Sequence, residues 1–155
     1  MTLNDLDILR TEEVRRAIDE NIEREPAKIA LSKGVPHAAL VATQVKYLQR
    51  ARRKLPALYE ARCIIPPLAF EQCSSQESAR RKPLAGGAVL DMTCGLGIDT
   101  MALAENFERV VSIERDETLA EVVRYNMSLL GIDNVEVITA SSEEYVASTT
   151  EHFDW

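Results

Sequence analysis

The chain has 155 residues, of which 46% are hydrophobic and 28% charged, and its net charge is −7. This composition predicts a soluble globular protein with a substantial core and argues against disorder. No apolar run approaches the roughly 18 residues of a membrane span, and the acidic N-terminal stretch lacks the pattern of a signal peptide. Three cysteines without CxxC spacing and two histidines disfavour a metal site and indicate reduced thiols in a cytoplasmic protein.

Charge is distributed unevenly along the chain. Residues 1–84 contain 15 Lys or Arg and 11 Asp or Glu, whereas residues 85–155 contain 3 and 14. The basic excess is concentrated between positions 38 and 84. This asymmetry indicates either two modules or a basic face beside an acidic one. The division expected here is a helical N-terminal domain over 1–84 and a second domain over 85–155.

The first module carries patterns typical of helices. Apolar residues recur on one helical face over 11–22 and over 38–55, and Pro26 predicts the start of a short helix that stops near Gly34. The segment 62–70, "RCIIPPLAF", contains two prolines and is predicted to be extended or edge structure. "SSQESARRK" then predicts a short helix capped by Ser74 or Ser75.

After residue 85 the pattern changes to strands that alternate with helices. Strands are predicted over 88–91, 109–114 and 134–140, helices over 97–105, 116–130 and 141–147, and the opening of a fourth strand over 153–155. Such alternation predicts an α/β fold with a doubly wound parallel sheet.

The turn after the first predicted strand reads "VLDMTCGLGIDT". Gly95 and Gly97 can adopt positive φ and let a ligand approach the backbone, although a sharp turn that binds nothing is the alternative. The dinucleotide pattern requires a third glycine where Thr100 stands. Carboxylates end both flanking strands, Asp91 on the first and Glu114 on the second, where Glu114 is placed to accept both hydroxyls of a ribose. Together these features favour a cationic nucleoside without phosphates, such as S-adenosylmethionine.

These residues resemble motifs of the class I S-adenosylmethionine-dependent methyltransferases. "VLDMTCGLGIDT" is similar to their first motif, and "VVSIERD" is similar to their second, with Glu114 as the ribose acid. The resemblance implies a Rossmann-like methyltransferase sheet and S-adenosyl-L-methionine as the cofactor. Where the family commonly has an acidic residue near the adenine amine, this chain has Ser141 and Ser142. The cofactor-binding residues implied here are Asp91, Thr93, Cys94, Gly95, Gly97, Asp99, Thr100, Glu114, Arg115, Ser141 and Ser142.

The resemblance extends before the glycine turn. The run from "KLPALYEA" through "EQCSS" to "DMTCGLGIDT" is similar to trimethylguanosine-synthase-like, RNA-type members, and more narrowly to bacterial methyltransferases whose longer chains end in a THUMP-like, RNA-associated module. Their segment before the first motif closes over the methionine end of the cofactor. This implies that Gln72, Ser74 and Ser75 line the pocket, whereas a capped helix with solvated serines is the alternative.

In this family the reactive motif lies at the end of the fourth strand. By resemblance, the chain is therefore predicted to be the front portion of a longer enzyme, with its first three strands and the start of the fourth. Any catalytic residue would lie beyond Trp155, and this fragment is expected to be inactive by itself. The fourth strand normally lies beside the first, so the first strand is expected to form an exposed edge through which the fragment self-associates.

A basic segment over residues 46–54 suggests RNA as a partner. Lys46, Arg50, Arg53 and Lys54 lie on or near one side of a predicted helix and could contact RNA phosphates, although a solvated charged face is the alternative. Two other functions remain open. One is a nicotinamide-dependent oxidoreductase, which the missing third glycine disfavours, and the other is a non-catalytic RNA- or protein-binding module with a vestigial turn.

Overall fold

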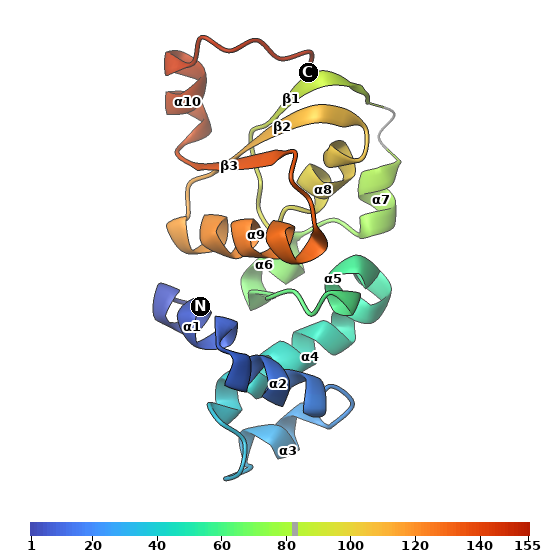
Figure 1. The fold of residues 1–155 in the computed structure, drawn as a ribbon, viewed down its shortest axis with the longest axis vertical. Coiled ribbons are helices and arrows are strands. Elements are labelled where there is room, and N and C mark those ends of the chain that lie inside the picture. Colours follow the sequence, from blue (N-terminus) through green and yellow to red (C-terminus); the bar gives the residue numbers. More distant parts are fainter. Residues whose placement is uncertain (82–83) are drawn as a thin grey trace. The chain divides into compact units, whose positions relative to one another are not determined.

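A computed structural model describes residues 1–81 and 84–155 of the chain. These residues form two compact units, Met1–Glu71 and Gln72–Trp155, which Figure 1 shows in sequence colours. The first unit is helical and the second alternates strands and helices. The boundary lies earlier than the predicted residue 85 because the helix over Gln76–Arg80 packs against an element of the second unit.

The first unit is built from short helices around one long helix. Their bounds are α1 Leu3–Arg10, α2 Glu12–Glu20, α3 Pro26–Ala30, α4 Ala38–Lys54, α5 Pro56–Glu60 and α6 Pro67–Gln72, which ends at the unit boundary. Thr11 caps the N-terminus of α2, since its hydroxyl accepts a hydrogen bond from the Val14 N–H. Pro26 is the first residue of α3, as the sequence predicts, although this helix ends at Ala30, before Gly34.

The long helix α4 supplies the core of the first unit. Val41, Val45, Leu48 and Ala51 are buried, which confirms the predicted apolar face. The amide of Gln44 is also buried, and it donates to the Ile65 carbonyl (3.2 Å) and accepts from the Ile65 N–H (2.9 Å). These two bonds hold the chain after α5 against α4 and satisfy backbone groups that would otherwise be buried without partners.

The prediction that 62–70 is extended or edge structure is wrong in its second half. Residues 63–66 are irregular and buried, but Pro67 begins α6. Proline suits the first turn of a helix, where its missing N–H costs no hydrogen bond. The same effect starts α5 at Pro56, directly after α4 ends.

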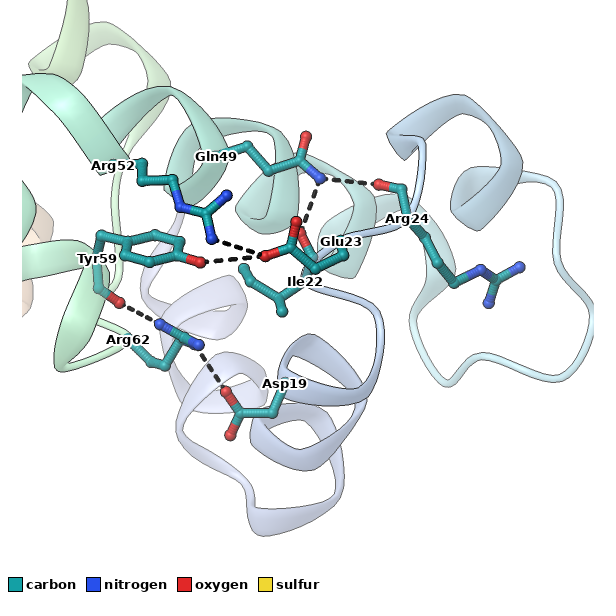
Figure 2. A network of polar contacts seen from close by, with 8 residues as sticks. All are labelled: Asp19, Ile22, Glu23, Arg24, Gln49, Arg52, Tyr59 and Arg62. Atoms are coloured by element: carbon teal, nitrogen blue, oxygen red, sulfur yellow. Dashed lines mark hydrogen bonds and ion pairs between the residues drawn. The ribbon is translucent and has the colours of Figure 1, made fainter.

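A polar network ties α2, α4 and α5 together within the first unit (Figure 2). Glu23 accepts from the Tyr59 hydroxyl (3.4 Å) and pairs with Arg52 (3.1 Å), while Arg62 pairs with Asp19 (2.9 Å). The guanidinium groups of Arg52 and Arg62 lie 5.1 Å and 4.6 Å from the centre of the Tyr59 ring. Because this ring is buried and contacted by two cations, Tyr59 is a packing residue of the first unit.

The second unit contains a parallel sheet with helices packed on it. Its strands are β1 Gly86–Asp91, β2 Phe107–Glu114 and β3 Val135–Thr139, and its helices are α7 Gln76–Arg80, α8 Ile98–Ala104, α9 Glu117–Leu130 and α10 Ser142–Ser148. The strand order is β1-β2-β3, and both pairs are parallel. α8 packs on β1 and β2, and α9 packs on β2 and β3. This confirms the predicted α/β sheet with strands that alternate with helices.

The helices of this unit begin and end where the sequence predicts. Asp116 caps α9 by accepting from the Leu119 N–H (2.9 Å), and Gly131 ends α9 with a φ of +67°. Of the two serines proposed as the cap of α7, Ser75 performs this role by accepting from the Ser78 N–H (3.1 Å).

The last residues of the chain lie along the edge of β1 that faces away from β2. The Asp154 N–H donates to the Ala88 carbonyl (2.8 Å), and the Leu90 N–H donates to the Trp155 carbonyl (3.1 Å). The Asp154 carboxylate accepts from the Gly87 and Ala88 N–H groups (2.7 and 3.0 Å). Residues 153–155 are not a strand in the structure, yet they occupy the place predicted for the start of a fourth one.

An arginine on β2 holds the same terminal segment. Arg109 pairs with Glu151 (2.5 Å) and with Glu136 of β3 (2.9 Å). These hydrogen bonds raise the pKa of Arg109, and the bond from Arg109 lowers the pKa of Glu151 below its ordinary value. Part of the β1 edge is therefore covered, in contrast to the fully exposed edge that the sequence suggested.

Candidate functional site

The glycine turn joins β1 to α8 at the carboxyl end of the sheet. Gly95 has a φ of +55° and Gly97 a φ of +79°, both in the left-handed region that favours glycine. A Cβ atom on Gly97 would lie 3.0 Å from both Met127 Cε and Val123 Cγ1, whereas a Cβ on Gly95 would meet nothing within 4 Å. Gly97 is thus required for packing against α9, and Gly95 borders open space.

The carboxylate of Asp91 is held by a small hydrogen-bonded cluster. Its Oδ2 atom accepts from the hydroxyls of Thr100 (2.6 Å) and Ser112 (3.1 Å), and its Oδ1 atom accepts from the Thr93 N–H (3.1 Å). All three donors are neutral. Within 1–81 and 84–155, no basic side chain lies within ion-pairing distance of Asp91, so its negative charge is not offset by a cation there.

Cys94 lies beside this cluster rather than in the open turn. Its thiol is 3.8 Å from the Thr100 hydroxyl, and its backbone N–H donates to the Ile113 carbonyl (2.9 Å). Burial raises the pKa of Cys94 to about 11, with a smaller contribution from the nearby negative charge of Asp91. Cys94 is therefore a protonated, packed thiol at neutral pH and is poorly suited to act as a nucleophile.

Glu114 lies at the end of β2 and faces the same turn. Its Oε2 atom accepts from the Gly95 N–H (3.0 Å) and its Oε1 atom accepts from the Asp116 N–H (2.9 Å). The first bond fixes the turn to β2, and the second fixes the start of α9. Each carboxylate oxygen keeps a further lone pair, so Glu114 can still accept hydrogen bonds from a ligand.

Of the two serines after β3, Ser141 caps the next helix and Ser142 contacts the glycine turn. Ser141 caps α10, because its hydroxyl accepts from the Glu144 N–H (3.2 Å) and donates to the Glu144 carboxylate (2.9 Å). The Ser142 hydroxyl donates to the carbonyl of Met92 in the turn. The carboxyl ends of β1, β2 and β3 are thereby joined around one region, as expected for a ligand site in a parallel sheet.

The remaining residues predicted to bind the cofactor are exposed or half-buried, and one of them, Thr93, also donates its backbone N–H to Asp91. Thr93 and Arg115 are exposed, and Asp99 lies half-buried in the first turn of α8. Gln72 and Ser74 are exposed before α7. Their roles in binding stay predictions.

One residue that holds the Asp91 carboxylate, Ser112, was not predicted from the sequence. Ser112 is fully buried on β2 and pairs in register with Asp91. A single polar residue inside the apolar run "VVSIE" was the available signal, because a buried hydroxyl requires a hydrogen-bond partner. Only the parallel register identifies that partner as Asp91.

The basic residues of α4 differ in the contacts that they make. Arg50 forms an ion pair with Glu71 and lies 5.1 Å from the Tyr47 ring centre and 4.9 Å from that of Phe70. The bond to Arg50 lowers the pKa of Glu71 below its ordinary value, and the same pairing raises the pKa of Arg50. Lys54 donates to the Phe70 carbonyl (2.8 Å). Arg50 and Lys54 therefore attach α6 to α4, a structural role that the sequence did not reveal.

Lys46, Arg50 and Arg53 are exposed members of the same basic set, whereas Lys54 is half-buried. Lys46 and Arg50 border an open groove of about 600 Å³, which is also lined by Glu25, Pro26, Ala27 and Gln49. Charges of both signs lie along this groove. The role of the four basic residues in contacting RNA stays a prediction.

In residues 1–81 and 84–155, no three His, Cys, Asp or Glu side chains are grouped so that they could hold a metal ion. No helix in the part of the chain that the structure describes is both long and apolar enough to cross a bilayer.

The parallel sheet and the glycine turn place this unit among the open α/β proteins, in which ligands bind at the carboxyl ends of the strands. A family model described as tRNA (uracil-5-)-methyltransferase matches residues 79–154. This match covers the whole sheet and its helices. It begins within α7, so it leaves out the helical first unit.

The chain is similar to curated RNA methyltransferases and to one solved structure. A tRNA/tmRNA (uracil-C(5))-methyltransferase from Colwellia psychrerythraea is 44% identical over 61 residues, which are 39% of this chain and 17% of the relative. The protein of the same name from Photorhabdus laumondii is 42% identical over 59 residues, 38% of this chain and 16% of the relative. A crystal structure of a candidate methyltransferase from Porphyromonas gingivalis W83 aligns with a TM-score of 0.75 and 32% identity, over 86% of this chain and 36% of that one.

These similarities confirm the predicted family. Residues 79–154, just under half of the chain, match a family of RNA methyltransferases. The chain spans about a sixth of the length of the curated relatives it matches. The activity, substrate and partners of a whole protein are therefore taken up as proposals.

Proposed function

We propose that this chain is the S-adenosylmethionine-binding portion of a methyltransferase that acts on RNA. The observation that carries the proposal is the pair of carboxylates, Asp91 and Glu114, on either side of the Gly95 turn. Neither carboxylate has a basic partner in the described ranges, 1–81 and 84–155, so the site favours a cationic ligand and disfavours a pyrophosphate.

The residues of the turn fit such a cofactor. Gly95 borders open space, so its backbone can lie against a ligand. Glu114 would accept hydrogen bonds from the ribose hydroxyls, and Ser142, whose position is fixed by Met92, lies where the adenine is expected. When bound, S-adenosylmethionine supplies a methyl group activated by its sulfonium, and the protein's task is to orient it and keep water away.

RNA is proposed as the class of acceptor. The curated relatives are named for uracil C5 in tRNA and tmRNA, so a uridine-containing tRNA is the first acceptor to try with a complete protein. We expect the 155-residue chain itself to bind the cofactor without transferring its methyl group. The chain covers only 17% and 16% of these relatives, and no acceptor-activating group is identified among its described residues.

Calorimetric titration separates this proposal from the oxidoreductase alternative. The chain is titrated with S-adenosylhomocysteine and with NAD under the same conditions. We expect heat of binding with S-adenosylhomocysteine and none with NAD, because NAD would bring a pyrophosphate between two carboxylates. Asp91→Ala should weaken the binding of S-adenosylhomocysteine, and unchanged binding in this variant would favour a non-catalytic module with a vestigial turn.

A further inference from the structure

Two buried hydroxyls hold the Asp91 carboxylate from behind. Thr100 on α8 and Ser112 on β2 both have 0% exposure, and their oxygens lie 2.6 Å and 3.1 Å from the same atom, Asp91 Oδ2. The two hydroxyl oxygens are 3.0 Å from each other. Because neither hydroxyl reaches solvent, neither is placed to touch a ligand.

This arrangement determines which carboxylate oxygen is presented to the turn. With Oδ2 engaged by hydroxyls on two different elements, the carboxylate cannot rotate without breaking buried hydrogen bonds. Oδ1 then points toward the turn, where its partner is the Thr93 N–H (3.1 Å) and a lone pair remains. The donors are neutral groups, so they hold the carboxylate in place without pairing it with a cation.

We propose that Thr100 and Ser112 are positioning residues that orient Asp91 toward the ammonium group at the amino-acid end of an adenosyl cofactor. The inference rests on the proposed function. Glu114 is assigned to the ribose, so the carboxylate on the neighbouring strand is left for the charged end of the same molecule. Thr100 therefore acts through Asp91 rather than by contacting the cofactor, which changes the role implied by its place in the first motif.

A pair of ligands tests the orientation of Asp91. S-adenosylhomocysteine carries the ammonium group, whereas 5′-methylthioadenosine has the same nucleoside and thioether without the amino-acid end. Thr100→Val keeps the shape of the side chain and removes its hydroxyl. We expect it to weaken S-adenosylhomocysteine about tenfold, as for a lost hydrogen bond to a charged group, and to leave 5′-methylthioadenosine within about twofold of wild type.

Thr100→Ser is the matched control, because it keeps the hydroxyl and loses only a methyl group. Its affinities for both ligands should remain near those of wild type. Ser112→Ala repeats the comparison at a second position without adding volume, and circular dichroism checks that each variant is folded. Equal weakening of both ligands by Thr100→Val and Ser112→Ala, or no weakening of either, would overturn the inference. A wild-type chain that binds neither ligand would overturn the proposed function, and with it this inference.

Discussion

Gly95 and Gly97 lie one residue apart in the same turn, but they differ in what surrounds them. Both have positive φ, which costs a residue with a side chain about 1–2 kcal/mol. Gly97 also lies against α9, where a Cβ would be 3.0 Å from side-chain atoms of Met127 and Val123. The sequence motif alone treats the two glycines alike, and only the packing distinguishes them.

Replacement of each glycine by alanine should separate these two effects. We expect Gly97→Ala to lower the free energy of unfolding by about 2–4 kcal/mol, since overpacking adds to the backbone strain. Gly95→Ala has no such clash and should cost about 1 kcal/mol. Urea denaturation followed by circular dichroism measures both. Equal losses in the two variants would show that packing against α9 is not what requires Gly97.

The residues of the candidate site could be predicted to different degrees. Asp91 and Glu114 follow from their places at strand ends, because the strand pattern puts such residues at the mouth of a parallel sheet. Ser112 could not be assigned its role, since its partner Asp91 is 21 residues away and meets it only through the register of β1 and β2. The internal pairing of Arg50 likewise depends on where α6 folds back onto α4.

At the scale of elements, α4 and α6 are joined by a basic residue that the sequence had suggested for RNA. Arg50 pairs with Glu71 and lies over the rings of Tyr47 and Phe70. The prediction that residues 62–70 are extended failed at the same place. Two prolines in a short segment predict an interruption of regular structure, but Pro67 occupies the first helical position, where proline is favourable.

Alanine variants of Arg50 and Arg53 form a matched pair that tests the role of the basic surface in binding RNA. Arg53→Ala should weaken RNA binding, reduce the slope of log affinity against log salt by about 1, and leave the melting temperature unchanged. Arg50→Ala should lower the melting temperature, because it removes the contacts that hold α6. Filter binding over a range of salt concentrations and thermal denaturation measure these effects. A salt slope unaffected by Arg53→Ala would exclude Arg53 from the RNA surface.

At the scale of the second unit, the edge of β1 is the place where we expect copies of the chain to associate. Hydrogen bonds with Asp154 and Trp155 cover the edge of β1 at Gly87, Ala88 and Leu90. The first residue of the strand, Gly86, is exposed. Self-association through β1 stays a prediction. Light scattering at micromolar concentration should show a species larger than a monomer, and Asp154→Ala should increase it by freeing two N–H groups on the edge. A monomer in both cases would contradict the prediction.

The parallel direction of the strands in the second unit followed from apolar runs that alternate with capped helices. The order β1-β2-β3 was not predicted and comes from the structure. The boundary between the two units was harder to place, because α7 is polar in sequence and its membership depends on packing against α8.

The central claim is that the carboxyl ends of β1, β2 and β3 form one site for an adenosyl cofactor. Its most direct test is the change in backbone amide chemical shifts when S-adenosylhomocysteine is added to the isotopically labelled chain. We predict that the largest changes fall on the Gly95 turn, on Glu114 and Arg115, and on Ser141 and Ser142, and that NAD at the same concentration leaves these amides unchanged. Shifts confined to other parts of the chain, or equal shifts with NAD, would contradict it.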